Sequence, residues 1–181
     1  MFGAGRKMIK RLKWATFGED GNATIEFVIL FPAIMTIFLS SFEVGIYLTR
    51  AVLLDRALDL NVRLLRLGSL DPATSDNLKQ RVCTDALIFK DCPSAITIEL
   101  TEVDTTTWNL PSGRMTCVDR NNEDIEPVVT FNTGALNDLM LVRACTVLDP
   151  FFGTTPFVMQ LPLDASGGYI VAAASTFVNE P

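Results

Sequence analysis

Carboxylates and cysteines are the side chains of this sequence that could take part in chemistry, because the 181-residue chain contains no histidine. The absence of histidine excludes Ser-His-Asp and Cys-His nucleophile arrangements, histidine metal ligands and a histidine general base. The sequence also has no glycine-rich phosphate loop and no nucleophile elbow. We therefore expect no enzymatic activity, no cofactor and no catalytic residue.

Two glutamates, Glu26 and Glu43, stand at the ends of the run Phe27 to Phe42, which has no charged residue. A carboxylate at the middle of a bilayer costs about 2.5–3.5 kcal/mol on insertion scales, so acidic residues in such runs are functional candidates. For Glu43 the simpler interpretation is a position in the headgroup layer on the far side. Glu26 has no equally simple interpretation, because of the glycine that precedes it.

A cut after Gly21 would make Asn22 the new N-terminus and Glu26 the fifth residue of the shortened chain. The first and fifth residues of a helix share a face, so the Glu26 carboxylate and the new ammonium could neutralise each other. Alternatively, Glu26 of an incoming subunit could pair with the ammonium of a neighbour, because an unpaired charge in an apolar environment is costly. The simpler alternative is that Gly21 only separates the leader from the helix.

The apolar run predicts a membrane-spanning helix. Extended over residues 25–48, it would be roughly 36 Å long at ~1.5 Å per residue, enough for a hydrocarbon core of about 30 Å. Residues 1–21 carry five basic and two acidic side chains, so the positive-inside rule keeps this leader in the cytoplasm. A buried core helix is the alternative. A secretory signal peptide fits poorly, because the helical pattern continues beyond the run.

We expect the helix to continue to about residue 67, with an amphipathic outer half and Gly68 as its stop. The expected apolar stripe consists of Leu53, Ala57, Leu60, Leu64 and Leu67. Asp59 and Arg63 stand four residues apart and are expected to pair on the exposed side. Asp71 and Pro72 are interpreted as the cap and the first turn of a second helix over residues 72–90.

Residues 68–181 are predicted to form a small periplasmic α+β domain. Alternating and β-branched patterns predict strands over 95–103, 139–148 and 169–178. Residues 105–138 are interpreted as a long loop with a short strand at 128–131. Three strands beside helices favour an antiparallel sheet packed on the outer half of the long helix. Phe151, Phe152 and Phe157 are expected in the core rather than in an exposed docking patch.

The cysteines are Cys83, Cys92, Cys117 and Cys145. No Cys-x2-Cys spacing occurs, so we expect no zinc or other metal site. An even number of cysteines in an exported domain indicates two disulfides. Three connectivities are possible, and we favour Cys83–Cys92, which closes a short loop after the second helix, and Cys117–Cys145, which ties the long loop to a strand. The net charge of −6 makes nucleic acid an improbable partner.

A basic leader, a glycine, four residues, Glu-Phe and a long apolar helix together resemble a class IV prepilin. The details resemble the TadE-like proteins of the tight adherence (Tad, or Flp) pilus system. They are Glu26-Phe27, the early Pro32, Glu43 before Gly45, and a final strand followed by Asn179-Glu180-Pro181. The resemblance is strongest over residues 18–67 and 169–181.

This resemblance implies a pilin-like fold and a single-pass minor pilin or pseudopilin that helps to assemble an adhesion pilus. A prepilin peptidase would cut between Gly21 and Asn22, and Glu26 and Phe27 would serve in processing and assembly. The implied partners are the membrane, the peptidase, other Tad/Flp pilins and the inner-membrane assembly platform. The body would lie in the periplasm, anchored in a bacterial inner membrane, or in the extracellular pilus. The alternative is an uncleaved, anchored periplasmic sensor or adhesin.

Overall fold

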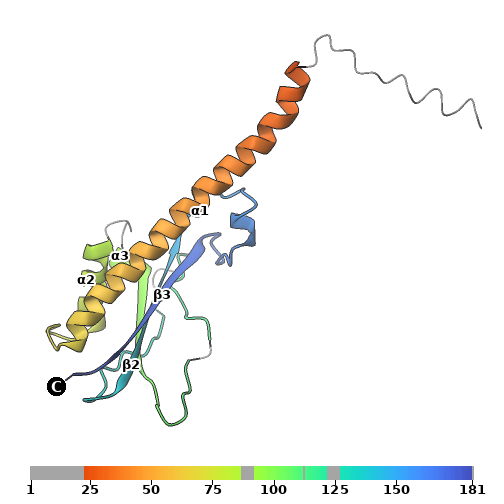
Figure 1. The fold of residues 1–181 in the computed structure, drawn as a ribbon. Coiled ribbons are helices and arrows are strands. Elements are labelled where there is room, and N and C mark those ends of the chain that lie inside the picture. The colour runs from red at the N-terminus through yellow and green to blue at the C-terminus, as the bar shows by residue number, and fades with distance from the viewer. Residues whose placement is uncertain (1–22, 87–91, 112, 122–126, 181) are drawn as a thin grey trace, which may run out of the picture. The chain divides into compact units, whose positions relative to one another are not determined.

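The computed structural model describes residues 23–86, 92–111, 113–121 and 127–180. The chain divides into two units, residues 1–38 and 39–181. Helix α1, Ala23–Arg66, includes all the described residues of the first unit and continues into the second (Figure 1). The predicted long helix is therefore present to within a residue at its C-terminal end.

Helix α1 ends where the sequence places a glycine. Gly68 adopts a positive φ of 63°, a conformation that L side chains rarely adopt. The turn lets the N–H of Ser69 donate to the carbonyl of Leu64 at 2.9 Å and the N–H of Gly68 donate to that of Leu65 at 3.1 Å. These bonds satisfy carbonyl groups that the end of a helix otherwise leaves unpaired.

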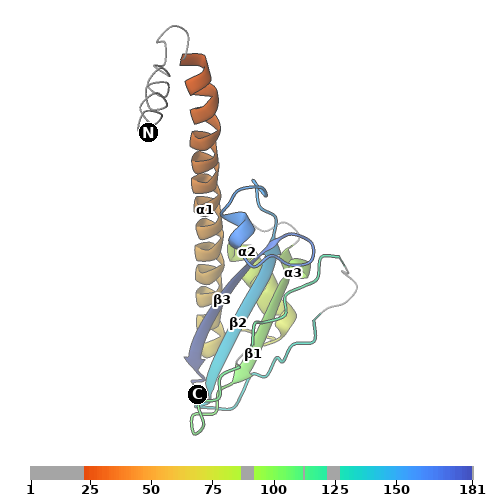
Figure 2. The same cartoon turned by 90° about the vertical axis from the view of Figure 1, so that its right-hand side faces the viewer.

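The second unit is an α+β body built on one sheet. Helices α2, Ser75–Ala86, and α3, Cys92–Ala95, precede strand β1, Ile96–Glu102. Strands β2, Leu139–Leu148, and β3, Tyr169–Val178, follow, with the short 3₁₀ helix η2, Val158–Gln160, between them. The strands pair antiparallel in the order β1-β2-β3 (Figure 2). The predicted fold class is confirmed, and the bounds of β2 and β3 match the expected ranges.

The core lies between one face of this sheet and the helices. Along the C-terminal half of α1, the side chains that are buried are Leu54, Ala57, Leu58, Asn61, Val62 and Leu65. The apolar stripe expected from the sequence is confirmed at Ala57 and is partly buried at Leu53 and Leu64, but it is wrong at Leu60 and Leu67. Leu60 and Leu67 are half exposed, at 50% and 53%. The true stripe is rotated by about one residue, and both sets share helical spacing, so periodicity alone could not separate them.

Helix α2 packs beside the C-terminal half of α1 in both views (Figures 1 and 2). Buried Asn61 of α1 donates to the carboxylate of Asp85 at 2.7 Å and to the carbonyl of Ala57 at 2.9 Å, so a polar residue is satisfied within the core. Leu78, Val82 and Ala86 of α2 are buried on one face, as predicted.

Three local predictions are wrong. Pro72 is not in the first turn of α2, because the helix begins at Ser75 and the hydroxyl of Thr74 accepts the N–H of Asn77 at 3.3 Å as its cap. Residues 87–90 of the predicted second helix lie outside the described residues.

The expected strand at 128–131 is reduced to an isolated bridge between Phe131 and Leu100. In the part of the chain that the structure describes, no ion pair joins Asp59 to Arg63.

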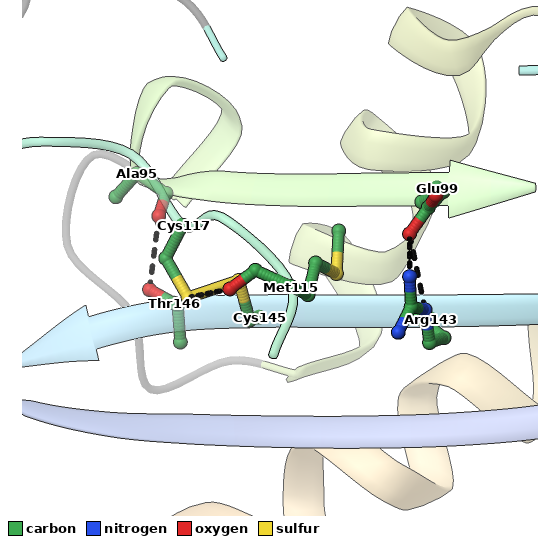
Figure 3. The surroundings of a disulfide bond; sticks show 7 residues. All are labelled: Ala95, Glu99, Met115, Cys117, Arg143, Cys145 and Thr146. Carbon is green, nitrogen blue, oxygen red and sulfur yellow. Dashed lines mark hydrogen bonds and ion pairs between the residues drawn. A yellow bond between two sulfur atoms is a disulfide. The ribbon is translucent and has the colours of Figure 1, made fainter. Parts of the chain in front are cut away.

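Two disulfides join the body, Cys83–Cys92 and Cys117–Cys145, each with a Cα–Cα distance of 5.6 Å. These are the two pairs that the sequence analysis favours. The first links α2 to α3. The second fixes a loop segment to β2, on the face of the sheet opposite the core, where the ion pair between Arg143 and Glu99 also lies (Figure 3). Alternation of side chains along a strand puts Cys145 and Arg143 on that outer face.

The stripe of α1 can be tested with two leucines of the same helix. Leu58 is fully buried against the body, so Leu58→Ala should lower the free energy of unfolding by about 2–5 kcal/mol. Leu60→Ala, at a half-exposed position, should change it by less than about 0.5 kcal/mol. Denaturant unfolding of the detergent-solubilised chain measures both values, and a larger cost for Leu60→Ala would contradict the assignment.

Candidate functional site

Two of the four residues predicted to act in processing and assembly, Glu26 and Phe27, lie at the start of α1. The other two, Gly21 and Asn22, lie outside the described residues. Glu26 and Phe27 lie in the first turns of the helix and are exposed, and the Phe27 ring is 5.2 Å from that of Phe31, centroid to centroid. The structure therefore presents Glu26 and Phe27 on the surface of the first unit.

The helical part of the first unit, residues 23–38, has an apolar surface that the unit itself leaves exposed. The exposed large side chains include Ile25, Phe27, Val28, Ile29, Leu30, Ile34, Ile37 and Phe38. Helix α1 is long and apolar enough to span a membrane, and its most hydropathic window has none of its residues buried. An apolar surface of this extent marks a site that lipid or protein covers.

Glu43 occupies a different environment from that expected. It is fully buried in the second unit, although it was assigned to a headgroup layer from the sequence. Its two carboxylate oxygens accept backbone N–H groups of the loop that follows β2, from Phe151 at 3.2 Å and from Phe152 at 2.9 Å. A carboxylate bonded to two amides is far less costly to bury than an isolated one, because the amides replace the hydrogen bonds of water. Glu43 thus attaches this loop to α1.

An aromatic and cationic cluster continues from Glu43 along the same face of α1. Tyr47 stacks edge-on against Tyr169 at 5.3 Å and against Phe157 at 6.0 Å. Arg50, one turn further, donates to the phenol oxygen of Tyr169 and to the carbonyl of Asp149 at 2.9 Å. The Arg50 guanidinium also lies over the Phe151 and Tyr169 rings, at 5.2 and 5.7 Å from their centroids.

Burial raises the pKa of Tyr169 above the ordinary value of 10.0, and the hydrogen bond and charge of Arg50 oppose the shift. Desolvation is the larger effect, because a phenolate is poorly accommodated where water is excluded. Tyr169, the first residue of β3, therefore stays a neutral phenol against α1 and accepts the Arg50 hydrogen bond in that form.

The three phenylalanines of the loop after β2 were all expected in the core, and for one of them this prediction is wrong. Phe152 and Phe157 are half-buried against α1, but the Phe151 side chain is 63% exposed and does not belong to the core. One pattern in the sequence predicts this site: Glu43, Tyr47 and Arg50 follow the same helical spacing as Leu54 and Leu58, so they continue the buried stripe.

The C-terminal Asn-Glu also makes specific contacts. The side-chain amide of Asn179 donates to the carbonyls of Thr133 and Ala135, at 2.6 and 3.0 Å. Glu180 accepts from Arg66, in the last turn of α1, with Nε–Oε1 at 2.9 Å. The end of β3 is thereby tied to the end of the long helix. Within the described ranges no group of His, Cys, Asp and Glu could hold a metal ion.

Comparison with known protein families gives a match within the first third of the chain. Residues 21–59 match the model of a family described as TadE-like protein. The match covers Glu26 and Phe27, the apolar run and Glu43, and it confirms the resemblance drawn from these residues. The family is a pilus-associated structural family and not an enzyme family. No curated protein and no solved structure gave a significant match.

The role of Glu43 can be tested by hydrogen–deuterium exchange. Glu43→Ala leaves the amides of Phe151 and Phe152 without their acceptor, and each lost bond costs about 1–3 kcal/mol, so both amides should exchange at least about fivefold faster. Glu43→Gln keeps one carbonyl acceptor and should have a smaller effect. Asp55→Ala, at an exposed position of α1, is the matched control. Unchanged exchange in Glu43→Ala would show that the carboxylate does not hold the loop.

The environment of Tyr169 predicts its titration. The protein has two tyrosines, so Tyr47→Phe leaves Tyr169 as the reporter. Its tyrosinate absorbance should appear at a midpoint above pH 10, and above that of the same variant in denaturant. Because the folded-state pKa is the higher one, this stabilisation is present below pH 10 and is lost as the pH rises through the folded-state value. A midpoint at or below that of the unfolded chain contradicts the assignment.

Proposed function

We propose that this chain, whose residues 21–59 match the TadE-like family, is a minor pilin or pseudopilin required for assembly of a Tad/Flp adhesion pilus. The observation that carries this proposal is the division of α1. Its described residues up to Phe38 are exposed and mostly apolar, whereas one face from Glu43 onward is buried by the loop after β2 and by the sheet. Such a helix provides an anchor in lipid and a surface for other subunits, while the body folds independently.

The proposed topology follows from charge and redox chemistry. The basic leader, residues 1–21, would stay in the cytoplasm, α1 would cross the inner membrane over about residues 25–48, and residues 68–181 would lie in the periplasm. The two disulfides support this orientation, because such bonds persist in oxidising compartments and are rare in the cytosol. In an assembled pilus the same body would face the extracellular medium.

Maturation would be carried out by a prepilin peptidase that cuts between Gly21 and Asn22. The new ammonium at Asn22 would lie one helical turn from Glu26, close enough for the two charges to neutralise each other. Exposure of Glu26 and Phe27 on the first unit supports a role in contacts with other molecules rather than in this chain's own core. Partners would be other Tad/Flp pilins and the inner-membrane assembly platform.

Processing is tested by the mass of the chain extracted from membranes. We expect the wild-type protein to begin at Asn22, and Gly21→Leu to retain the leader, because a bulky side chain next to the scissile bond obstructs the peptidase. Phe17→Leu, within the leader but away from the bond, is the control and should be cut normally. A wild-type protein that keeps residues 1–21 would contradict the proposal and favour an uncleaved, anchored module.

Assembly is tested by counting pili in strains that carry Glu26 variants. Glu26→Gln removes the charge from an exposed position, so it should leave folding and membrane insertion unchanged and reduce pili at least about tenfold, the effect of losing one charge-assisted contact of 1.5–3 kcal/mol. Glu26→Asp should retain part of the function. Thr36→Ala, in the same exposed helical segment, is the uncharged control. Normal pili in Glu26→Gln would exclude an electrostatic role for this residue.

A further inference from the structure

A large groove lies in the second unit, beside the loop that Glu43 holds. It has a volume of about 1040 Å³, at the upper end of the range for sites that take small molecules. One wall is α1, through Phe42, Gly45, Ile46 and Arg50. The other is formed by the end of α3, by the loop residues Val118 and Arg120, and by the end of β2 with the residues that follow it. The surface is mostly apolar, and neither the Glu43 carboxylate nor the Tyr169 phenol lines it.

The charge of the groove is opposite to that of the chain around it. Residues 22–181 contain ten basic and nineteen acidic side chains, a net charge of −9. The groove is lined by two arginines, Arg50 and Arg120, and by one carboxylate, Asp149, a net charge of +1. A positive, apolar groove on an acidic body is complementary to a ligand that combines an anionic group with hydrocarbon.

The two arginines differ in how their charges are used. Arg120 is neutralised by the carboxylate of Asp149, at 2.6 Å, and is held by the hydroxyl of Ser166. Arg50 has only neutral hydrogen-bond acceptors, the Asp149 carbonyl and the Tyr169 phenol, and no carboxylate of the described chain forms an ion pair with it. Of the two arginines, Arg50 is therefore the one that has no carboxylate in ion-pair contact, and guanidinium groups suit phosphate oxygens.

The position of the groove along α1 indicates where such a ligand would come from. A hydrocarbon core of about 30 Å takes about twenty helical residues, so a core that begins at Ile25 ends near Val44, next to the residue at which the body begins to bury α1. Arg50 follows about 9 Å further along the helix axis, and its long side chain can extend back to the level of the headgroups. The groove thus begins at the edge of the hydrocarbon and reaches into the layer where lipid phosphates lie.

We propose that this groove binds one anionic phospholipid from the leaflet on the side of the body. Its phosphate bonds to Arg50, and an acyl chain lies along Phe42, Gly45 and Ile46. The inference rests on the proposed placement of α1 in a membrane and goes beyond the role in pilus assembly. The bound lipid would fill the space between α1 and the end of β2, where the body meets the membrane.

Gly45 offers a way to block the groove without damaging the helix. A Cβ atom built at this position meets nothing within 4 Å, and glycine is unfavourable in a helix interior. Gly45→Trp should therefore fill the groove while α1 and both arginines remain in place. Leu48→Trp introduces the same side chain one turn away, at an exposed position that does not line the groove.

The test is native mass spectrometry of the full chain in neutral detergent, titrated with phosphatidylglycerol or with phosphatidylcholine of the same acyl chains. We expect one phosphatidylglycerol per wild-type chain, bound at least about tenfold more tightly than phosphatidylcholine. Gly45→Trp and Arg50→Gln should each weaken it about tenfold or more, the effect of losing a charge-assisted bond in the second case. Leu48→Trp and Arg56→Gln, the matched controls on α1, should bind like wild type.

Several results would overturn the proposal. Equal binding by wild type and Gly45→Trp, or equal affinity for the two lipids, excludes an anionic lipid in this groove. Displacement of the lipid by glycerol phosphate alone, at the same concentration, indicates a phosphate site without hydrocarbon contacts. Loss of chain dimers rather than of lipid in Gly45→Trp identifies a second copy as the occupant. Because the readout uses purified chain, lipid binding without pili, or pili without lipid binding, separates this inference from the proposed function.

Discussion

The buried carboxylate of Glu43 marks the position along α1 at which the helix begins to pack against the body of the same chain. On the N-terminal side of it the helix carries exposed apolar side chains on all sides up to Phe38. From Glu43 onward one face is buried by the sheet and the loops of the same chain. The two amide donors of Phe151 and Phe152 make this possible, because they satisfy a charge that the preceding apolar run has no means to stabilise.

The rest of the body is organised around this face of α1. Tyr47, Arg50 and the leucines beyond them contact the loop after β2, Tyr169 and the inner face of the sheet in turn. The disulfide Cys117–Cys145 holds the connection between β1 and β2 on the outer face of β2, and Cys83–Cys92 joins α2 to α3 ahead of the sheet. Such bridges matter in a body this small, because the apolar area available for its core is limited.

Elements with a strong local pattern could be predicted from the sequence. The alternation of Leu139–Leu148 and Tyr169–Val178 gave both strands their observed bounds, and Gly68 gave the end of α1. The family resemblance in the first third rests on Glu26, Phe27 and the apolar run and is matched by the TadE-like model over residues 21–59.

Features that depend on tertiary contacts could not be predicted in this way. The buried stripe of α1 was displaced, because two sets of leucines share helical spacing and only the sheet selects Leu54 and Leu58. Glu43 was assigned to a headgroup layer, because the amides that bury it lie more than a hundred residues away in sequence. Phe151 was expected in the core, yet its backbone is held by Glu43 while its side chain remains exposed.

The most direct test of this division of α1 is hydroxyl-radical footprinting of the full chain in lipid nanodiscs. This experiment measures the oxidation of side chains that lie before and after Glu43 along the same helix. The account predicts that Phe27, Phe31 and Phe38 are protected from oxidation by lipid, whereas Leu60 and Leu67, which lie off the buried face, are modified as readily as in detergent-free unfolded chain. Oxidation of Phe27 and Phe38 to the same extent as Leu60 would contradict it.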